Sequence, residues 1–203
     1  MPVPLHLDGL IALTRRALGS ALAMGRESEQ PLFAVDCTAG NGHDTLFLAR
    51  EAGSGVRVWA FDIQEAAIVA TRERLAAAGP DVADRVTLVH GGHEGVGTAL
   101  PPGALGRVLA VTFNLGYLPG SDKRVVTQPD TTLAALGALF PLVAVGGVVS
   151  VHVYQGQSGG EAEVEAVACR LHSLPWDEWR VAEYSFANKS RNREVLFLAE
   201  KIG

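Results

Sequence analysis

The chain of 203 residues is poor in cysteine. Cys37 and Cys169 lie far apart and share no metal-type spacing with histidines. This scarcity excludes a disulfide framework and a cysteine-based zinc site, and we expect no metal site. We expect both cysteines to be buried free thiols.

The sequence also lacks long apolar runs and an excess of positive charge. No span is long and apolar enough to cross a bilayer, and the start "MPVPLHLDGL" lacks the basic residues and apolar core of a secretory signal. We therefore expect a cytoplasmic protein with no membrane partner. The formal net charge of −5 argues against a protein that grips nucleic acid over its whole surface, although it leaves room for a local basic patch.

The composition that remains is that of a compact globular protein. Hydrophobic residues make up 48% of the chain and charged residues 19%. We expect one domain over residues 1–203, with a helix within residues 1–25 that packs on it or caps it. An apolar face of this helix either covers the sheet of its own chain or forms a homodimer contact, and the sequence leaves both open.

Short apolar runs alternate with helical patterns along the chain. The strand-like runs are residues 31–36, 56–62, 85–90, 107–114 and 146–154, and the helical patterns are residues 45–53, 64–79, 131–140 and 160–174. This alternation predicts parallel strands with crossover helices on both faces. Residues 178–187 and 193–201 read as two further strands, and the joining stretch "NKSRN" is too short for a crossover, so they predict an antiparallel hairpin. The fold class is α/β, Rossmann-like, with a seven-stranded, mostly parallel sheet.

The first two strand ends carry a candidate ligand site. The first ends in "VDCTAGNGHDT", where Asp36 closes the strand and Gly40 and Gly42 allow a tight turn before a helix that begins near Asp44 or Thr45. The second strand ends at Asp62, whose carboxylate is placed to bind both hydroxyls of a ribose.

The glycine pattern separates two kinds of nucleotide ligand. A dinucleotide site needs a third glycine where this chain has Thr45, and Asp36 and Asp44 would repel a pyrophosphate. The same carboxylates suit a sulfonium and an α-amino group, so the loop favours S-adenosylmethionine. After the third strand, His93 or Glu94 is a candidate for the adenine edge, and a solvated loop is the alternative.

The stretch "FNLGYLPGSDK" follows the fourth strand. It resembles the Asn/Asp-Pro-Pro-Tyr/Phe loop of amino-group methyltransferases, with Leu115 and Gly116 in place of the prolines. A neutral acceptor such as the Asn114 side chain can hold the N–H groups of an attacking amine, and Tyr117 can stack on a flat base. Asn114 and Tyr117 are our catalytic candidates, and we assign no group to removal of the amine proton.

Four strings make the resemblance to one family specific: "VDCTAGNGHDTLFLA", "FNLGYLPGSDK", "VHVYQGQSGGEAE" and "NKSRN…LFLAEK". They resemble the small bacterial class I methyltransferases known as rRNA methylases, over almost the whole chain. The resemblance implies the class I methyltransferase fold and S-adenosylmethionine as cofactor. It also implies the activity of characterised members, which methylate the amine of 5-aminomethyl-2-thiouridine at the tRNA wobble position.

Motif and resemblance together give the predicted site. The predicted cofactor-binding residues are Asp36, Thr38, Gly40, Asn41, Gly42, Asp44, Thr45, Asp62, Gln64, His93 and Asn114. The predicted substrate-binding residues are Tyr117, Pro119, Gly120, Asp122, Lys123, Tyr154, Asn188 and Asn192. The chain departs from the family at Gln157, where members usually have histidine, and in the hairpin turn, where Arg191 and Arg193 are not family residues.

Several residues keep two interpretations. The cations of the hairpin turn either meet tRNA phosphates or form a solvated tip. His43 either accepts or relays the amine proton or has a structural role, and His6 either closes over the site or only leads into the first helix. His152 reads as a buried, hydrogen-bonded core residue.

The predicted function is methylation of 5-aminomethyl-2-thiouridine in the anticodon stem-loop of tRNA. The alternatives are methylation of rRNA or of a small-molecule amine, and a non-catalytic nucleoside-binding module. A nicotinamide oxidoreductase ranks last because of the missing glycine.

Overall fold

The structure is a computed structural model that describes residues 9–28, 30–116, 126–155, 160–190 and 193–203. In these residues, seven strands form one sheet in the order β3-β2-β1-β4-β5-β7-β6. The strands are β1 (Leu32–Asp36), β2 (Val56–Asp62), β3 (Val86–His90), β4 (Val108–Leu115), β5 (Val143–Tyr154), β6 (Trp179–Tyr184) and β7 (Glu194–Lys201). Strands β1 to β5 are parallel, so the predicted mostly parallel sheet is confirmed.

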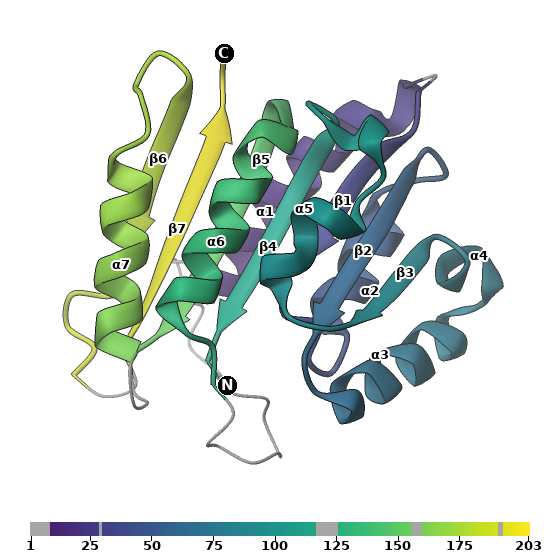
Figure 1. Ribbon diagram of the computed structural model, residues 1–203, viewed down its shortest axis with the longest axis horizontal. Coiled ribbons are helices and arrows are strands. Elements are labelled where there is room, and N and C mark those ends of the chain that lie inside the picture. Colours follow the sequence, from purple (N-terminus) through teal and green to yellow (C-terminus); the bar gives the residue numbers. More distant parts are fainter. Residues whose placement is uncertain (1–8, 29, 117–125, 156–159, 191–192) are drawn as a thin grey trace, which may run out of the picture.

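Helices cover both faces of the sheet, as strand–helix alternation predicts. They are α1 (Leu10–Ala23), α2 (His43–Glu51), α3 (Glu65–Ala78), α4 (Pro80–Ala83), α5 (Val96–Ala99), α6 (Pro129–Leu139) and α7 (Gly160–His172), and a 3₁₀ turn over Met24–Glu27 follows α1. Helix α6 contacts α5 and α7 in front of the sheet, whereas α1 lies behind it and contacts α2 (Figure 1). Strand β4 is covered on both sides, which explains why it buries seven of its eight residues and carries only two polar ones, Thr112 and Asn114.

Two apolar clusters form the core, one on each face of the sheet. The larger includes Phe61, Phe113 and Phe197, and the smaller includes Leu18 and Leu22 of α1. The N-terminal helix therefore packs on the sheet of its own chain through its apolar stripe.

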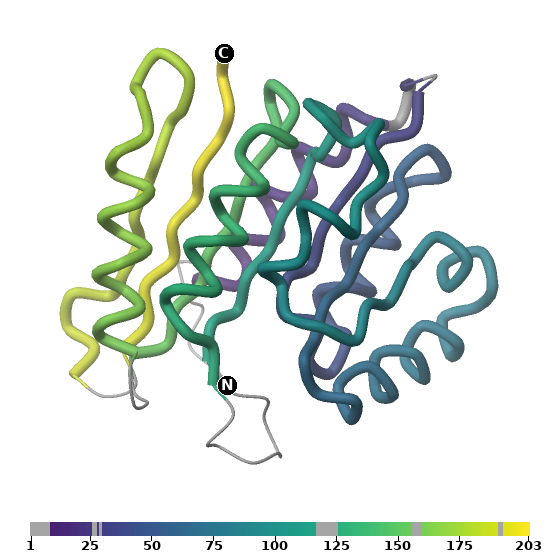
Figure 2. Tube along the Cα trace, in the orientation of Figure 1, coloured from purple at the N-terminus to yellow at the C-terminus, as the bar shows by residue number. Residues whose placement is uncertain are grey.

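The C-terminal hairpin is confirmed and has a specific position. Strand β7 lies between β5 and β6 and runs antiparallel to both, so the end of the chain lies beside a strand some 50 residues earlier (Figure 2). Strand β5 begins at Val143, three residues before the predicted start at Gly146. Gly146 and Gly147 therefore lie inside the strand, in an irregular stretch where the register with β4 shifts.

The cysteines divide between the core and the surface. Cys37 is buried, but Cys169 is exposed on α7, so the prediction that both are buried was wrong for Cys169. Helix α7 buries Val167 and Leu171. Cys169 is two positions from each of them along the helix, so it lies on the opposite, exposed side. In the described part of the chain, no helix has the length and apolar character needed to cross a membrane.

The strand order places the predicted site. From β1, the chain continues to β2 and β3 on one side of the sheet and then crosses to β4 on the other side of β1. The strand order therefore reverses between β1 and β4. Ligands of such sheets bind beyond the carboxyl ends of the strands at this reversal.

Candidate active site

A cavity of about 570 Å³ opens beyond the carboxyl ends of the central strands. Nine of the predicted site residues line it: Thr38, Gly40, Asn41, Asp44, Asp62, Gln64, His93, Asn114 and Tyr154. The volume suits a ligand of the size of an adenosyl amino acid.

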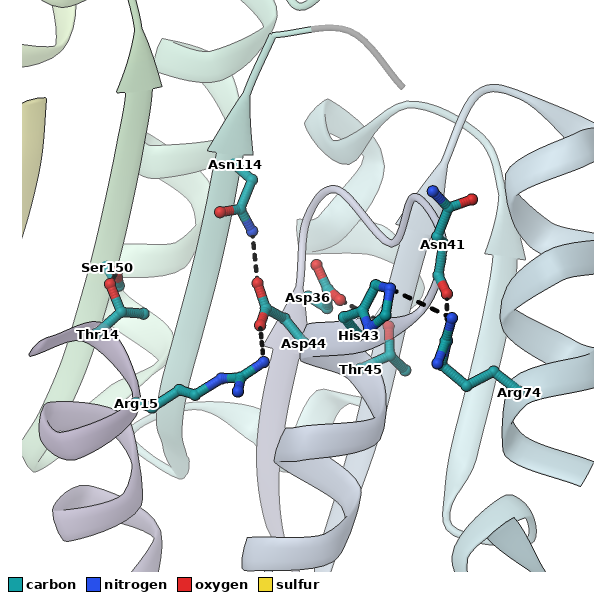
Figure 3. Close-up of polar contacts among 10 residues, drawn as sticks. All are labelled: Thr14, Arg15, Asp36, Asn41, His43, Asp44, Thr45, Arg74, Asn114 and Ser150. Atoms are coloured by element: carbon teal, nitrogen blue, oxygen red, sulfur yellow. Dashed lines mark hydrogen bonds and ion pairs between the residues drawn. The ribbon is translucent and has the colours of Figure 1, made fainter. Parts of the chain in front are cut away.

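The loop after β1 is held in shape by helix α3. Gly42 has φ 76°, and a Cβ atom there would lie 2.9 Å from Thr71 Cα, so this position requires glycine. The Thr71 hydroxyl donates to the carbonyl of Gly40 over 3.1 Å. Arg74 Nε donates to the carbonyl of Asn41 over 2.6 Å (Figure 3). The loop can therefore bring its backbone close to a ligand without losing its own shape.

Asp62 joins the ends of β1 and β2. Its Oδ2 accepts a hydrogen bond from Gly40 N and its Oδ1 accepts one from Gln64 N, both over 2.9 Å. A carboxylate oxygen has two lone pairs, so each oxygen can still accept a bond from a ribose hydroxyl. This geometry supports the predicted role of Asp62.

Asp36 lies outside the cavity wall, together with Gly42 and Thr45. Asp36 is fully buried, accepts a 2.6 Å bond from the Thr45 hydroxyl and a 3.1 Å bond from Thr38 N, and burial raises its pKa to about 7. These three predicted residues shape the loop rather than line the cavity, and Thr45 occupies the position where a dinucleotide site has glycine.

His93 presents one defined tautomer to the site. Its Nδ1 lies 3.1 Å from the carbonyl oxygen of Cys37, which can only accept, so Nδ1 carries the proton. Burial lowers the pKa of His93, which keeps the ring neutral at pH 7. Its Nε2 has no partner among the described residues, so its lone pair can accept a bond from the 6-amino group of adenine.

Asn114 has a fixed side-chain orientation. Its Nδ2 donates to Asp44 Oδ2 over 2.8 Å (Figure 3). Its backbone N donates to the Thr38 hydroxyl over 2.7 Å. A carboxylate can only accept, so the amide nitrogen must face Asp44 and the amide oxygen must face away from it. Asn114 therefore offers a neutral acceptor at the end of β4.

A buried carboxylate supports the side of the cavity that follows β4. Glu163 of α7 accepts a 2.7 Å bond from the Thr127 hydroxyl and a 2.9 Å bond from the Thr132 hydroxyl, and burial raises its pKa. Thr127 also lines the cavity, and its backbone N donates to the carbonyl of Gly116 over 3.1 Å. This contact joins the two ends of the segment that bears the predicted acceptor residues.

Tyr154 lines the cavity at the end of β5 and stacks on His152, with ring centroids 4.5 Å apart. His152 is buried and its Nε2 lies 3.0 Å from Glu194 Oε2, as expected for a hydrogen-bonded core histidine. Burial lowers the pKa of His152, although Glu194 opposes the effect.

The remaining predicted residues fall into two groups. Asn188 is exposed in the β6–β7 turn and does not line the cavity, and the neighbouring Lys189 is paired with Glu194. The others lie outside the described residues: His6, Tyr117, Pro119, Gly120, Asp122, Lys123, Gln157, Arg191 and Asn192.

Sequence reasoning missed part of the cavity wall. Ile11 and Arg15 of α1 line it, as do Thr127, Gln128 and Thr131 at the start of α6. Thr127, Gln128 and Thr131 adjoin the predicted start of the helix after the fourth strand, and this position could have identified them. The sequence of the N-terminal helix gave no comparable signal for Ile11 and Arg15. Among the described residues, no group of three or more His, Cys, Asp or Glu side chains could hold a metal ion.

Comparison with known proteins places the chain in a family. A relative from Arabidopsis thaliana, "tRNA (mnm(5)s(2)U34)-methyltransferase, chloroplastic", is 36% identical over 173 residues, which cover 82% of this chain but 62% of that protein. The solved structure of a putative rRNA-methylase from Clostridium thermocellum is 33% identical with a TM-score of 0.85, covering 98% of this chain and 100% of that one. A putative methyltransferase from Streptococcus mutans, solved in complex with SAH (S-adenosylhomocysteine), is 31% identical with a TM-score of 0.82 and covers 97% and 99%. Residues 58–200 match the family model described as "Putative rRNA methylase", and the chain belongs to that family.

Proposed function

We propose that this protein transfers a methyl group from S-adenosylmethionine to the amine of 5-aminomethyl-2-thiouridine at the wobble position of tRNA. The enzyme class is that of S-adenosylmethionine-dependent methyltransferases, to which its family and its similar solved structures belong. The choice of an amine as acceptor depends on Asn114, whose amide oxygen is turned away from Asp44 at the end of β4.

The cavity fits the donor at its nucleoside end. Asp62 offers carboxylate lone pairs for the ribose, and the unpartnered Nε2 of buried His93 offers an acceptor for the adenine amino group. Asp44 lines the same cavity and adds a negative charge, which suits the sulfonium and the α-amino group.

The residues of the chain need only to position the acceptor. The bound donor supplies a methyl group that is already activated by its sulfonium, so a strong base is not required. Asn114 would accept one N–H of the amine and thereby hold the nitrogen lone pair in line with the methyl carbon. As the N–C bond forms, the C–S bond would break and release S-adenosylhomocysteine, and the nitrogen would lose one proton to water. Tyr154, which lines the cavity on the neighbouring strand, offers an aromatic face to the base.

The tRNA acceptor is supported by the name of the Arabidopsis relative, and the description of the family supports rRNA as a second candidate. Both of these acceptors are RNA. The net charge of −5 over the whole chain is unusual for an RNA-binding protein, so a small-molecule amine is included as a third acceptor in the test.

The test is mass spectrometry of nucleosides from hypomodified tRNA incubated with purified protein and S-adenosylmethionine. We expect 5-aminomethyl-2-thiouridine to gain one methyl group on nitrogen. Undermethylated rRNA and simple amines are assayed in parallel, and turnover of one of these instead would replace the proposed acceptor. Donor binding without turnover of any of them would favour a non-catalytic nucleoside-binding module.

A further inference from the structure

The charge of the cavity wall poses a problem for the donor. Among the described residues that line it, three are carboxylates, Asp44, Asp62 and Glu94, and Arg15 is the sole lysine or arginine. The amino-acid end of S-adenosylmethionine carries a carboxylate as well as an ammonium group. A carboxylate placed in this wall would be repelled unless it lay beside Arg15.

Arg15 lies toward the end of the cavity where the amino acid should bind. It belongs to α1, which packs against β4 and β5 and contacts α2. Asp62, in contrast, ends β2 and Glu94 follows β3, and both strands lie on the other side of β1. Because the ribose and adenine are assigned to β2 and β3, the rest of the donor extends toward β4 and α1.

The guanidinium of Arg15 is oriented but not fully used by its neighbours. Its Cζ lies 5.4 Å from the ring centroid of Phe47, and its Nη2 lies 3.6 Å from Asp44 Oδ1. The second distance is longer than a hydrogen bond, and the side chain is 46% exposed. A guanidinium has five N–H donors in a planar fork that matches a carboxylate.

We propose that Arg15 binds the α-carboxylate of the methyl donor while Asp44 receives its α-amino group. Both groups sit on one carbon atom of the ligand, and the two side chains lie next to each other in the site (Figure 3). The pair is thus complementary to an amino-acid zwitterion, and helix α1 is part of the donor site. This inference rests on the donor site of the proposed function and does not depend on which acceptor is methylated.

Binding calorimetry with two ligands tests this role without measuring activity. S-adenosylhomocysteine is compared with its analogue that lacks only the carboxylate, S-adenosyl-3-thiopropylamine, on the full chain and on Arg15→Gln. For the parent we expect the analogue to bind about 10-fold or more weakly, the value of a charge-assisted hydrogen bond. In Arg15→Gln, the affinity for S-adenosylhomocysteine should fall by about the same factor. The analogue should bind equally well or more tightly, because Asp44 then has the ligand ammonium without a competing cation.

A neighbouring arginine provides the control. Arg16→Gln removes the same charge from the same helix at a position that does not line the cavity, and it should change neither affinity. Arg15→Lys keeps the charge but not the fork, so it should retain part of the discrimination. An equal loss for both ligands in Arg15→Gln would show that Arg15 acts through Asp44 and would overturn the proposal, as would a parent that does not discriminate. Failure of the parent to bind S-adenosylhomocysteine at all would instead overturn the donor site of the proposed function.

Discussion

The side-chain amide of Asn114 donates a 2.8 Å hydrogen bond to Asp44, a residue 70 positions earlier in the chain. The bond joins the end of β4, where an acceptor is expected, to the first turn of α2, where the donor loop ends. It also decides which atom of Asn114 is available to a substrate. The predicted donor and acceptor sites are therefore linked through one amide.

We expect Asn114→Ala to lower kcat by about 100-fold, because the amine loses the acceptor that orients it. The affinity for S-adenosylhomocysteine should stay within about 3-fold of the parent, less than the value of one net hydrogen bond, since the backbone bond from Asn114 N to Thr38 is kept. Single-turnover kinetics and calorimetry measure the two quantities separately. If donor affinity fell by as much as turnover, Asn114 would belong to the donor site instead.

Asp62→Ala should raise the dissociation constant of S-adenosylhomocysteine by about 100-fold or more. The substitution removes the predicted ribose acceptor and also frees the backbone N–H groups of Gly40 and Gln64 that Asp62 now holds. The matched control is Asp81→Ala, which removes an exposed carboxylate of α4 that does not line the cavity. Equal affinity of Asp62→Ala and the parent would refute the ribose assignment.

The place of Asp62 and Asn114 on the cavity wall was predictable from sequence because two simple rules coincide there. Asp62 and Asn114 come directly after apolar runs, and the carboxyl ends of parallel strands meet at one edge of the sheet. The seven strands and the terminal hairpin followed from the same runs. Both rules use only positions that are close together in the chain.

The residues that sequence reasoning missed depend on contacts between distant segments. The apolar stripe of α1 shows that it packs on the sheet, but not that Arg15 reaches the cavity. Similarly, a carboxylate at the end of a strand does not reveal that Asp36 is fully buried with both oxygens bonded. Such facts need the packed structure, because they depend on how far one element slides over another.

The buried carboxyl group of Asp36 should make stability depend on pH. Its pKa is raised from 3.8 to about 7 by burial, so the folded state holds a proton that the unfolded chain releases near pH 4. The contribution of this carboxyl group to the free energy of unfolding is therefore present in full at low pH and is lost as the pH rises toward 7. Asp36→Asn removes that loss, so the free energy of unfolding of the variant minus that of the parent should be about 3 kcal/mol larger at pH 8 than at pH 5. Urea unfolding at both pH values measures the difference, and parallel pH curves for the two proteins would contradict it.

Glu163 should position the acceptor side of the cavity without contacting the donor. Its carboxylate accepts the hydroxyls of Thr127 and Thr132, and Thr127 in turn bonds to Gly116 at the end of β4. Glu163→Ala leaves both hydroxyls without this acceptor, so the wall loses its fixed position. We expect KM for the RNA acceptor to rise about 10-fold while the affinity for S-adenosylhomocysteine is unchanged.

Two further variants separate positioning from a general loss of stability. Glu163→Gln can accept a bond from one threonine hydroxyl and donate to the other, so it should restore most of the acceptor affinity. Glu165→Ala, exposed on the same helix, removes a carboxylate that does not line the cavity and should behave as the parent. If Glu163→Ala weakened donor and acceptor binding equally, the carboxylate would stabilise the whole site and not its acceptor wall. A selective rise in KM that Glu163→Gln reverses would place the control of acceptor binding in α7, a helix that contributes no residue of its own to the described cavity wall.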